Sequence, residues 1–251
     1  MMALSKITNY LNNYLQHAHI ADYSGAKNGL QLANNGRVSQ VMAAVDANGL
    51  TVAKAIEARA DLLLVHHGLF WNEEVLMVGA RYGLFKAAMD ANLAIYSSHL
   101  PLDAHPKLGN NVLLSKALKL ASGKPAFEEK GTSIGRLITT CCDRKELCRR
   151  LGRVLGGEPK LIAAGPRVVR RLGVITGGAG NRIYDVAKSG IDTFVTGEGS
   201  HWTFGAAHEL KINLIYGGHY ATETFGVKAL ANHVGQRFRL RWSFIDVPSG
   251  L

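Results

Sequence analysis

The 251-residue sequence predicts an α/β protein built from two similar lobes, which arose by internal duplication and hold a metal site in the cleft between them. Short β-rich apolar runs alternate with helical patterns along almost the whole chain, and such alternation is typical of parallel or mixed sheets covered by helices. Two segments of the first half recur in the same order in the second half. In both halves, histidines and carboxylates follow directly after strand candidates.

The predicted elements alternate regularly. Strands are expected over 41–46, 62–66, 93–97, 133–139, 171–176, 193–196 and 213–216. Helices are expected over 51–60, 82–91, 110–121, 144–155, 181–189, 203–211 and 224–235. Leu4, Ile7 and Leu11 form a helical stripe at the N-terminus, which favours an amphipathic first helix over a signal peptide.

The internal repeat rests on two pairs of segments. Residues 60–71 (ADLLLVHHGLFW) align without a gap on 191–202 (IDTFVTGEGSHW), at an offset of 131. Residues 85–99 match 204–219 with one residue inserted, so that the two segments end on matching histidines. Two matched pairs in the same order indicate a duplication.

The division between the lobes is predicted from composition. The stretch 121–131 (ASGKPAFEEKG) is the softest part of the chain, with Gly, Pro, Ser and Lys between more regular segments. We therefore expect a first lobe over 1–125 and a second over 126–251.

The net charge of +10 is unevenly distributed. Nine basic residues lie between 144 and 171, namely Arg144, Lys145, Arg149, Arg150, Arg153, Lys160, Arg167, Arg170 and Arg171. Arg237, Arg239 and Arg241 alternate with apolar residues near the C-terminus. This charge suits an anionic small molecule or a nucleic acid. A solvated face, with a half-exposed strand at 237–242, is the favoured alternative, because no nucleic-acid-binding motif accompanies the charge.

Cysteine and hydropathy patterns predict a cytoplasmic protein with no membrane span. Cys141, Cys142 and Cys148 are an odd set without a CxxC spacing, which favours reduced thiols over a disulfide framework or a zinc knuckle. No apolar run reaches the roughly 20 residues that a membrane helix needs.

Candidate metal ligands stand at the ends of three strands. His66 and His67 follow LLLV, His99 and Asp103 follow LAIYS, and His219 and Glu223 follow LIYGG. Because ligands bind beyond the carboxyl ends of strands in open α/β sheets, we expect these side chains to meet if the lobes face each other.

Local geometry refines this expectation. Adjacent residues within a regular strand point to opposite faces, so His66 and His67 are expected at the end of the strand, where Gly68 bends the chain and lets them turn toward two different ions. Glu223 is expected where a helix begins, with Thr222 as its cap, since a helix N-terminus favours an ionised carboxylate.

The donor set indicates the class of metal. Imidazole combined with carboxylate suits Zn, Fe, Mn, Co or Ni, whereas Ca²⁺ prefers oxygen ligands alone. Two ions need a bridging group, and either a carboxylate or water can bridge them. The cofactor predicted is therefore two divalent transition-metal ions.

At this point the motifs resemble a known family. VHHGLFW at 65–71, SHLPLDAHP at 98–106, TGEG at 196–199 and GGHYATE at 217–223 are similar to the dinuclear metal proteins called GTP cyclohydrolase I type 2 homologues, also known as the NIF-three-like or YbgI-type family. The similarity extends along the whole chain and includes NGLQL at 28–32.

The resemblance implies a ligand set. His67 and Asp103 would bind one ion, His66 and His219 the other, and Glu223 would bridge them. It also implies two similar α/β lobes and a homohexamer built from dimers.

Three further polar residues have open roles. His99 matches His219 in the repeat but lies outside the family's ligand set, so we predict a role beside the ligands or in proton handling. Glu198 matches His67 and is either a general base or a turn residue. His105 is expected to brace its loop.

Three functions remain in view. The leading prediction is a metal-dependent hydrolase of a small anionic, nucleotide-like substrate, in which paired ions activate water. The alternative is a non-catalytic metal-handling or regulatory protein that stores metal, delivers metal or binds a partner. Nucleic-acid binding rests on charge alone.

Overall fold

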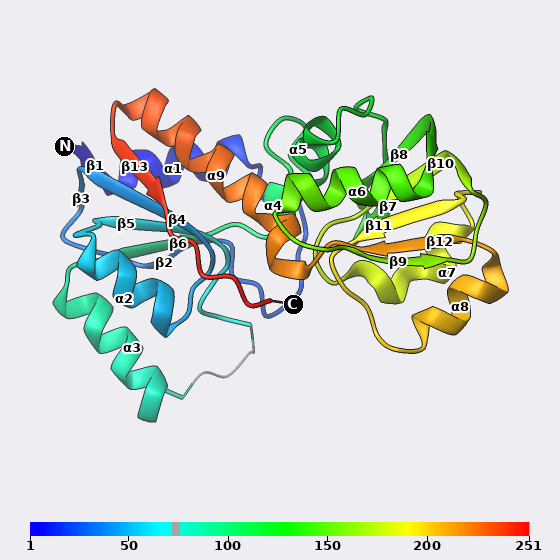
Figure 1. Cartoon of the computed structure of the whole chain (residues 1–251). Helices are drawn as coiled ribbons and strands as arrows, with labels where there is room; N and C mark the ends of the chain where they lie inside the picture. The colour runs from blue at the N-terminus through cyan, green and yellow to red at the C-terminus, as the bar shows by residue number, and fades with distance from the viewer. Residues whose placement is uncertain (72–75, 251) are drawn as a thin grey trace. The chain divides into compact units, whose positions relative to one another are not determined.

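The computed structural model describes residues 1–71 and 76–250 and divides the chain into two compact units (Figure 1). Unit 1 consists of Met1–His105 and Gly226–Val247, and unit 2 consists of Pro106–Phe225 with the last residues from Pro248 onward. The predicted α/β class is confirmed. This division differs from a single cut at 125–126 in two ways: the first boundary lies at 105–106, and residues 226–247 return to unit 1, where β13 pairs with its sheet.

Unit 1 is built on a five-stranded sheet of order β13-β4-β5-β6-β2. Its strands are β2 (Gly29–Leu32), β4 (Gln40–Asp46), β5 (Leu62–His67), β6 (Ala94–Ser97) and β13 (Arg241–Phe244). The first four strands in the sheet order run parallel, and β2 is antiparallel to β6. The same unit contains a short antiparallel pair, β1 (Met2–Ala3) with β3 (Arg37–Val38).

Helices cover both faces of this sheet (Figure 1). Helices α2 (Gly49–Glu57) and α3 (Gly79–Asp90) pack on one face, where Val52 and Phe85 join a core with Leu63 and Ile95. Helix α1 (Leu4–Tyr14) and the C-terminal part of α9 (His219–Phe238) lie on the other face. The short α4 (Leu100–Asp103) follows β6. Because both faces are covered, β4 and β5 are almost wholly apolar up to their carboxyl ends.

Unit 2 is built on a six-stranded sheet of order β7-β8-β10-β11-β12-β9. Its strands are β7 (Lys124–Glu129), β8 (Thr132–Asp143), β9 (Lys160–Ala163), β10 (Val168–Val174), β11 (Thr193–Thr196) and β12 (Asn213–Tyr216). The central β10, β11 and β12 are parallel, while β8 and β9 flank them antiparallel.

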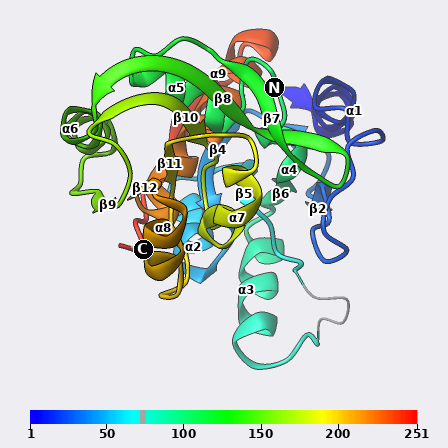
Figure 2. The same cartoon turned by 90° about the vertical axis from the view of Figure 1, so that its right-hand side faces the viewer.

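The helices of unit 2 separate onto the two faces of its sheet (Figures 1 and 2). Helices α5 (Asn110–Ala117) and α6 (Arg144–Leu155) cover one face, where Leu114, Leu147 and Leu151 pack on Val174 and Val195. The 3-10 helix η1 (Ala179–Arg182), α7 (Ile183–Ala187) and α8 (Thr203–Leu210) lie on the other face.

Two predicted elements differ at their ends. Helix α9 begins at His219 rather than 224, because its first turn is anchored by Tyr220 and Thr222, both buried. Glu223 therefore lies inside the helix, and Thr222 is not its cap. The run 237–242 is not one strand, since Arg237 belongs to the last turn of α9 and only Arg241 begins β13.

The two sheets share a pattern that supports the predicted duplication. Ala43 of β4 lies opposite Leu64 of β5, and Val174 of β10 lies opposite Val195 of β11. Each residue of the second pair is 131 positions after its counterpart in the first pair, which is the predicted offset. The left-handed turn residue before β5, Arg59, likewise recurs as Gly190 before β11.

The repeat continues with a different offset in the next segment. Asn92 before β6 and Lys211 before β12 are both left-handed, and the strand register matches Ser97 with Tyr216. Carried two residues further, this register aligns His99 with Gly218 instead of His219. The two histidines therefore stand at different places relative to the helix that follows. His99 is the residue before α4, whereas His219 is the first residue of α9.

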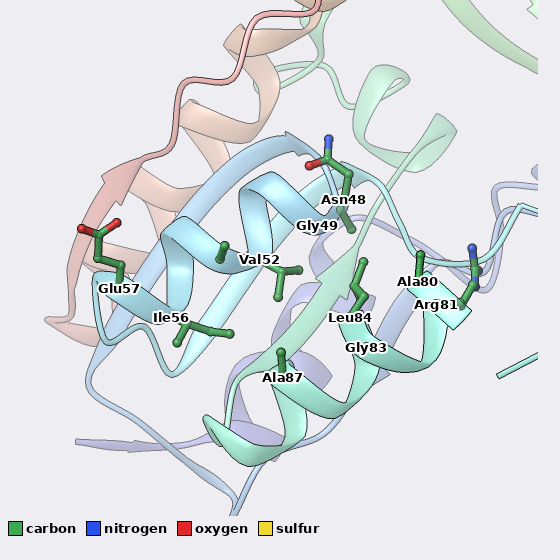
Figure 3. Close-up of a pocket in the computed structure, with 12 residues that line it drawn as sticks. Asn48, Gly49, Val52, Ile56, Glu57, Ala80, Arg81, Gly83, Leu84 and Ala87 are labelled. Carbon is green, nitrogen blue, oxygen red and sulfur yellow. The ribbon is translucent and has the colours of Figure 1, made fainter. Parts of the chain in front are cut away.

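A hollow of about 930 Å³ lies between α2 and α3 of unit 1 (Figure 3). Its walls are mainly apolar, with Val52, Ile56 and Leu84 pointing into it. No predicted site residue is among its described lining. Separately, no described helix is long and apolar enough to cross a membrane.

The left-handed turn at Gly190 generates a stability prediction. An added Cβ at 190 would make only ordinary contacts, at 3.6 Å or more from Arg171, so Gly190→Ala should cost about 1 kcal/mol through backbone strain alone. Gly205→Ala in exposed α8, where an added Cβ meets no described atom within 4 Å, should instead stabilise by up to about 1 kcal/mol. Urea unfolding measures the free energy of unfolding of both variants. Equal changes in the two would contradict the backbone strain expected at position 190.

Candidate metal centre

Unit 1 gathers three histidines at the carboxyl ends of β5 and β6. The possible ligand atoms of His66, His67 and His99 all lie within 4.8 Å of one another. Both His66 and His67 belong to β5, yet their rings are only 4.7 Å apart. The predicted strand 62–66 therefore extends one residue further, and the two histidines stand at its end as expected. His67 is the last residue of β5, where the sheet no longer imposes the alternation.

An acceptor oxygen holds the Nδ1 atom of each ring in β5. His66 Nδ1 donates to the carbonyl oxygen of Ser98 at 3.0 Å, and His67 Nδ1 donates to Asp46 Oδ1 at 2.7 Å. Asp46 reaches His67 because the two residues are paired across β4 and β5. A proton fixed on Nδ1 leaves Nε2 as the ligand atom of a neutral imidazole, and hydrogen-bonded carboxylates orient such rings in metal sites.

His99 is held in the same way by a buried carboxylate. Its Nδ1 donates to Asp22 Oδ1 at 2.9 Å, and its ring lies 4.9 Å from that of His66. Trp71 packs edge-on against His99 at 5.0 Å and against His67 at 5.4 Å. Burial alone would raise the pKa of Asp22, but hydrogen bonds from His99, Asn28 and the Tyr23 backbone hold that pKa below its ordinary value.

The NGLQL segment positions these groups. Asn28 accepts from the backbone N–H of His99 and donates to Asp22, so one amide holds both members of the pair. The Gln31 side chain accepts from the Leu69 backbone at 2.6 Å and occupies the space where a Cβ on Gly68 would lie. Gly68 thus lets Gln31 pack directly under the chain that follows His67.

A carboxylate completes the unit 1 group. Asp103, the last residue of α4, places Oδ2 3.5 Å from His66 Nε2, and its side chain is nearly buried. His105 packs its ring 4.7 Å from Tyr14, which fits its predicted bracing role.

Unit 2 supplies an imidazole between two carboxylates. His219 Nδ1 donates to Glu198 Oε1 at 2.8 Å, and His219 Nε2 lies 3.1 Å from Glu223 Oε2. The pKa of His219 is raised to about 9, chiefly by the hydrogen bond with Glu223 and further by Glu198, although burial opposes the rise. Two carboxylates around one imidazole favour a positive charge at this point, whether a proton or a metal ion.

A glycine makes room for the Glu223 carboxylate. Gly177 follows β10 in the left-handed region at φ +69°, and a Cβ there would lie 2.1 Å from Glu223 Oε1. The Gly177 N–H donates to Thr222, while its carbonyl accepts from the backbones of Gly197 and Glu198. This loop therefore joins the ends of β10 and β11 to the first turn of α9.

These donor groups fit divalent transition metals. Ligand atoms at about 2.1 Å from one tetrahedral ion lie about 3.4 Å apart. The distances from His66 to Asp103 and from His219 to Glu223 are close to this value. In unit 1 the predicted His66, His67 and Asp103 lie together, and in unit 2 His219 and Glu223 lie together.

Sequence reasoning missed Asp46 and Asp22. Asp46 ends an apolar run at the same sheet edge as the predicted ligands, which is a signal that could have found it. Asp22 lies in an irregular stretch and offers no such signal. The structure also gives Glu198 an arrangement that was not predicted, because it holds the ring of a candidate ligand.

Comparison with known proteins identifies the family. Residues 2–249 match the family described as Duf34/NIF3 (NGG1p interacting factor 3). The chain belongs to the Duf34/NIF3 family. The resemblance predicted from the motifs is thereby confirmed.

Individual Duf34/NIF3 proteins match over their full length. A Deinococcus radiodurans protein named GTP cyclohydrolase 1 type 2 homolog is 36% identical, covering 98% of this chain and 94% of its own. A Pyrococcus horikoshii protein of the same name is 37% identical, with 100% of both chains covered. A crystal structure of a Thermus thermophilus protein superimposes with a TM-score of 0.92 at 35% identity, covering 100% of each chain. HcgD of Methanocaldococcus jannaschii, at 23% identity and a TM-score of 0.86 over 98% of each chain, shares the fold.

The carboxylate behind His67 gives a prediction for metal binding. Asp46→Asn keeps the shape but weakens the hold on the ring, so affinity for the ion bound by His67 should fall about 10- to 100-fold. Calorimetric titration of chelator-stripped protein with Zn²⁺ measures the metal affinity of the variant and of the wild type. Asp90→Asn, which removes an exposed partner of Lys86, is the matched control and should change nothing. Unaltered affinity in Asp46→Asn would contradict the orienting role.

Proposed function

We propose that this Duf34/NIF3 protein binds two divalent transition-metal ions and uses them to hydrolyse a small anionic, nucleotide-like substrate. The ligands proposed from the family resemblance are His67 and Asp103 for one ion, His66 and His219 for the other, and Glu223 as the bridge. Zn, Fe, Mn, Co and Ni all suit such donors.

The arrangement of the four rings carries the proposal. In His66, His67, His99 and His219, the Nδ1 atom donates to an oxygen acceptor. Structural histidines need no such common arrangement, whereas metal ligands require a fixed tautomer and a fixed ring plane.

The chain's own groups have distinct proposed roles. A bound metal pair would lower the pKa of a water molecule and polarise the oxygen of a scissile group. Asp46 and Glu198 hold His67 and His219 in the orientation for binding. His99, held by Asp22 and packed against Trp71, lies beside the ligand rings, where it can exchange a proton with a substrate group.

One observation favours the alternative of a non-catalytic metal-handling protein. The carboxylate of Glu198, for which a general base is one of the two predicted roles, already accepts a hydrogen bond from the His219 ring at 2.8 Å. A protein that only stores or delivers metal needs the same orienting carboxylates and no base. The two functions are separated by measuring turnover in protein that is fully loaded with metal.

Assembly and location are further proposals. We expect a homo-oligomer larger than a dimer, built as a hexamer in line with the family resemblance, in the cytoplasm. Light scattering that finds a monomer at micromolar concentration would contradict the proposed oligomer.

Removal of the bridging residue tests the metal centre. Glu223→Ala should lose both ions, because a bridging carboxylate contributes to each, whereas His67→Ala should weaken mainly one. Elemental analysis of protein purified without added metal measures the stoichiometry. Nearly two ions per chain in Glu223→Ala would rule out the bridge.

Glu198→Gln separates the two roles of this residue. As a general base, its loss should reduce metal-dependent turnover by roughly two to four orders of magnitude at unchanged metal content. As an orienting residue for His219, its loss should lower metal affinity, and excess metal should restore turnover. The assays are metal titration and a screen of phosphoesters, nucleotides and cyclic amides, with and without chelator. The absence of turnover in loaded protein would favour metal handling.

A further inference from the structure

The basic residues between 144 and 171 are not equivalent in the structure. Arg144 donates to the carbonyl oxygens of Ala163 and Gly165, and Arg171 donates to those of Ser189 and Gly190. These two guanidiniums hold loops of unit 2 in place. Their charge is therefore explained by the fold.

Three other basic residues form a stripe along α6. Lys145, Arg149 and Arg153 recur every four residues, so they lie on one side of the helix. All three border a hollow of about 550 Å³ together with Cys148, Gly152, Gly157, Glu158 and Pro159. The side chains of Arg149 and Arg153 are each 68% exposed. We call Lys145, Arg149 and Arg153 the α6 stripe.

The charge of the stripe is only partly compensated. Glu146 lies 2.6 Å from Arg149, 3.0 Å from Arg150 and 3.2 Å from Arg153. Counting Glu158, which also borders the hollow, two carboxylates face Lys145 and three guanidiniums, which leaves an excess of positive charge. Glu146 also holds the arginines against α6, which reduces the entropy they lose on binding an anion.

Helix α6 holds the stripe rigidly at the surface. Leu147 and Leu151, on its opposite side, are fully buried in the unit 2 core. Asp143 caps its first turn by accepting from the backbones of Lys145 and Glu146, and Gly156 ends it in the left-handed conformation. The stripe therefore belongs to a fixed element and not to a loop.

We propose that the α6 stripe binds the phosphate backbone of a nucleic-acid duplex. Its cations are exposed and spread over about 12 Å of helix, whereas a small anion is usually held by converging, buried donors. Duplex DNA carries about seven phosphate charges along the same length. Contacts of this kind bind without reading sequence.

The surroundings of the stripe favour a duplex over a single strand. Proteins that bind single strands stack the bases on aromatic side chains. No aromatic residue is among the described lining of the hollow beside α6. The exposed Tyr184, Trp202 and Phe204 lie on or beside α7 and α8, which cover the other face of the sheet (Figure 2).

The experiment compares two triple variants of equal charge. Fluorescence anisotropy follows a labelled 20-base-pair DNA duplex, an RNA duplex of the same length and the single strands from 50 to 200 mM salt. Lys145→Gln/Arg149→Gln/Arg153→Gln should bind the duplexes at least tenfold more weakly than the wild type. The slope of log K against log salt should flatten by about two to three, since each phosphate contact contributes about 0.9. Lys6→Gln/Lys86→Gln/Lys188→Gln, which neutralises exposed lysines on other elements, should bind within about twofold of the wild type at 100 mM salt.

Further variants separate charge from folding and from the metal. Arg149→Lys/Arg153→Lys keeps the charge and should retain most of the affinity, and circular dichroism shows whether each variant is folded. Glu223→Ala should bind duplexes like the wild type even if it loses its ions, so this proposal and the proposed function fail independently. The proposal is overturned if the wild type does not bind at 50 mM salt, if both triple variants lose affinity equally, or if single strands bind more tightly than duplexes.

Discussion

Parallel pairing of β4 with β5 sets Asp46 opposite His67 at the carboxyl end of the unit 1 sheet, and the polar groups of this unit are arranged around that pair. The strands themselves are apolar because helices cover both faces. In β4 and β5 the charged and imidazole side chains stand at the carboxyl ends of the strands. The sheet therefore places His66, His67 and His99 together at its carboxyl edge, and hydrogen bonds to Ser98, Asp46 and Asp22 fix the rings.

Much of this arrangement is predictable from the sequence, because apolar periodicity and strand ends are local properties. The central strands of both sheets and the groups at their ends follow from such patterns. Two kinds of information do not. The pairing of Asp46 with His67 depends on the register between strands, and the contact of Asp22 with His99 joins residues 77 apart in sequence. Neither the strand register nor this long-range contact can be predicted from sequence periodicity.

The basic residues illustrate a different limit. Arg144 and Lys145 are adjacent and equally charged in the sequence, yet Arg144 turns inward to backbone carbonyls while Lys145 borders a hollow. Helical spacing could group Lys145 with Arg149 and Arg153, but it could not show that Arg144 and Arg171 are already engaged. A charge count therefore overstates the surface available to an anionic partner.

The two units have related backbones at their strand ends but carry different donors. Gly197 stands where unit 1 has His66, and a Cβ there would lie 2.6 Å from the Gly177 carbonyl oxygen and 2.7 Å from the His219 Cα. Both contacts are with backbone, which cannot move aside as a flexible side chain can. An imidazole at 197 would therefore require the Gly177 loop and the first turn of α9 to separate.

That separation would displace the groups that unit 2 does offer. The same loop gives Glu223 its space through Gly177, and the same first turn carries His219. Unit 2 can thus present His219 and Glu223 close to its sheet only if position 197 has no side chain. Glu198, one residue later, is not subject to this restriction and reaches His219 Nδ1. The absence of the histidine pair in the second copy and the presence of the imidazole and carboxylate on α9 therefore have one physical cause, the close packing of backbone around Gly197.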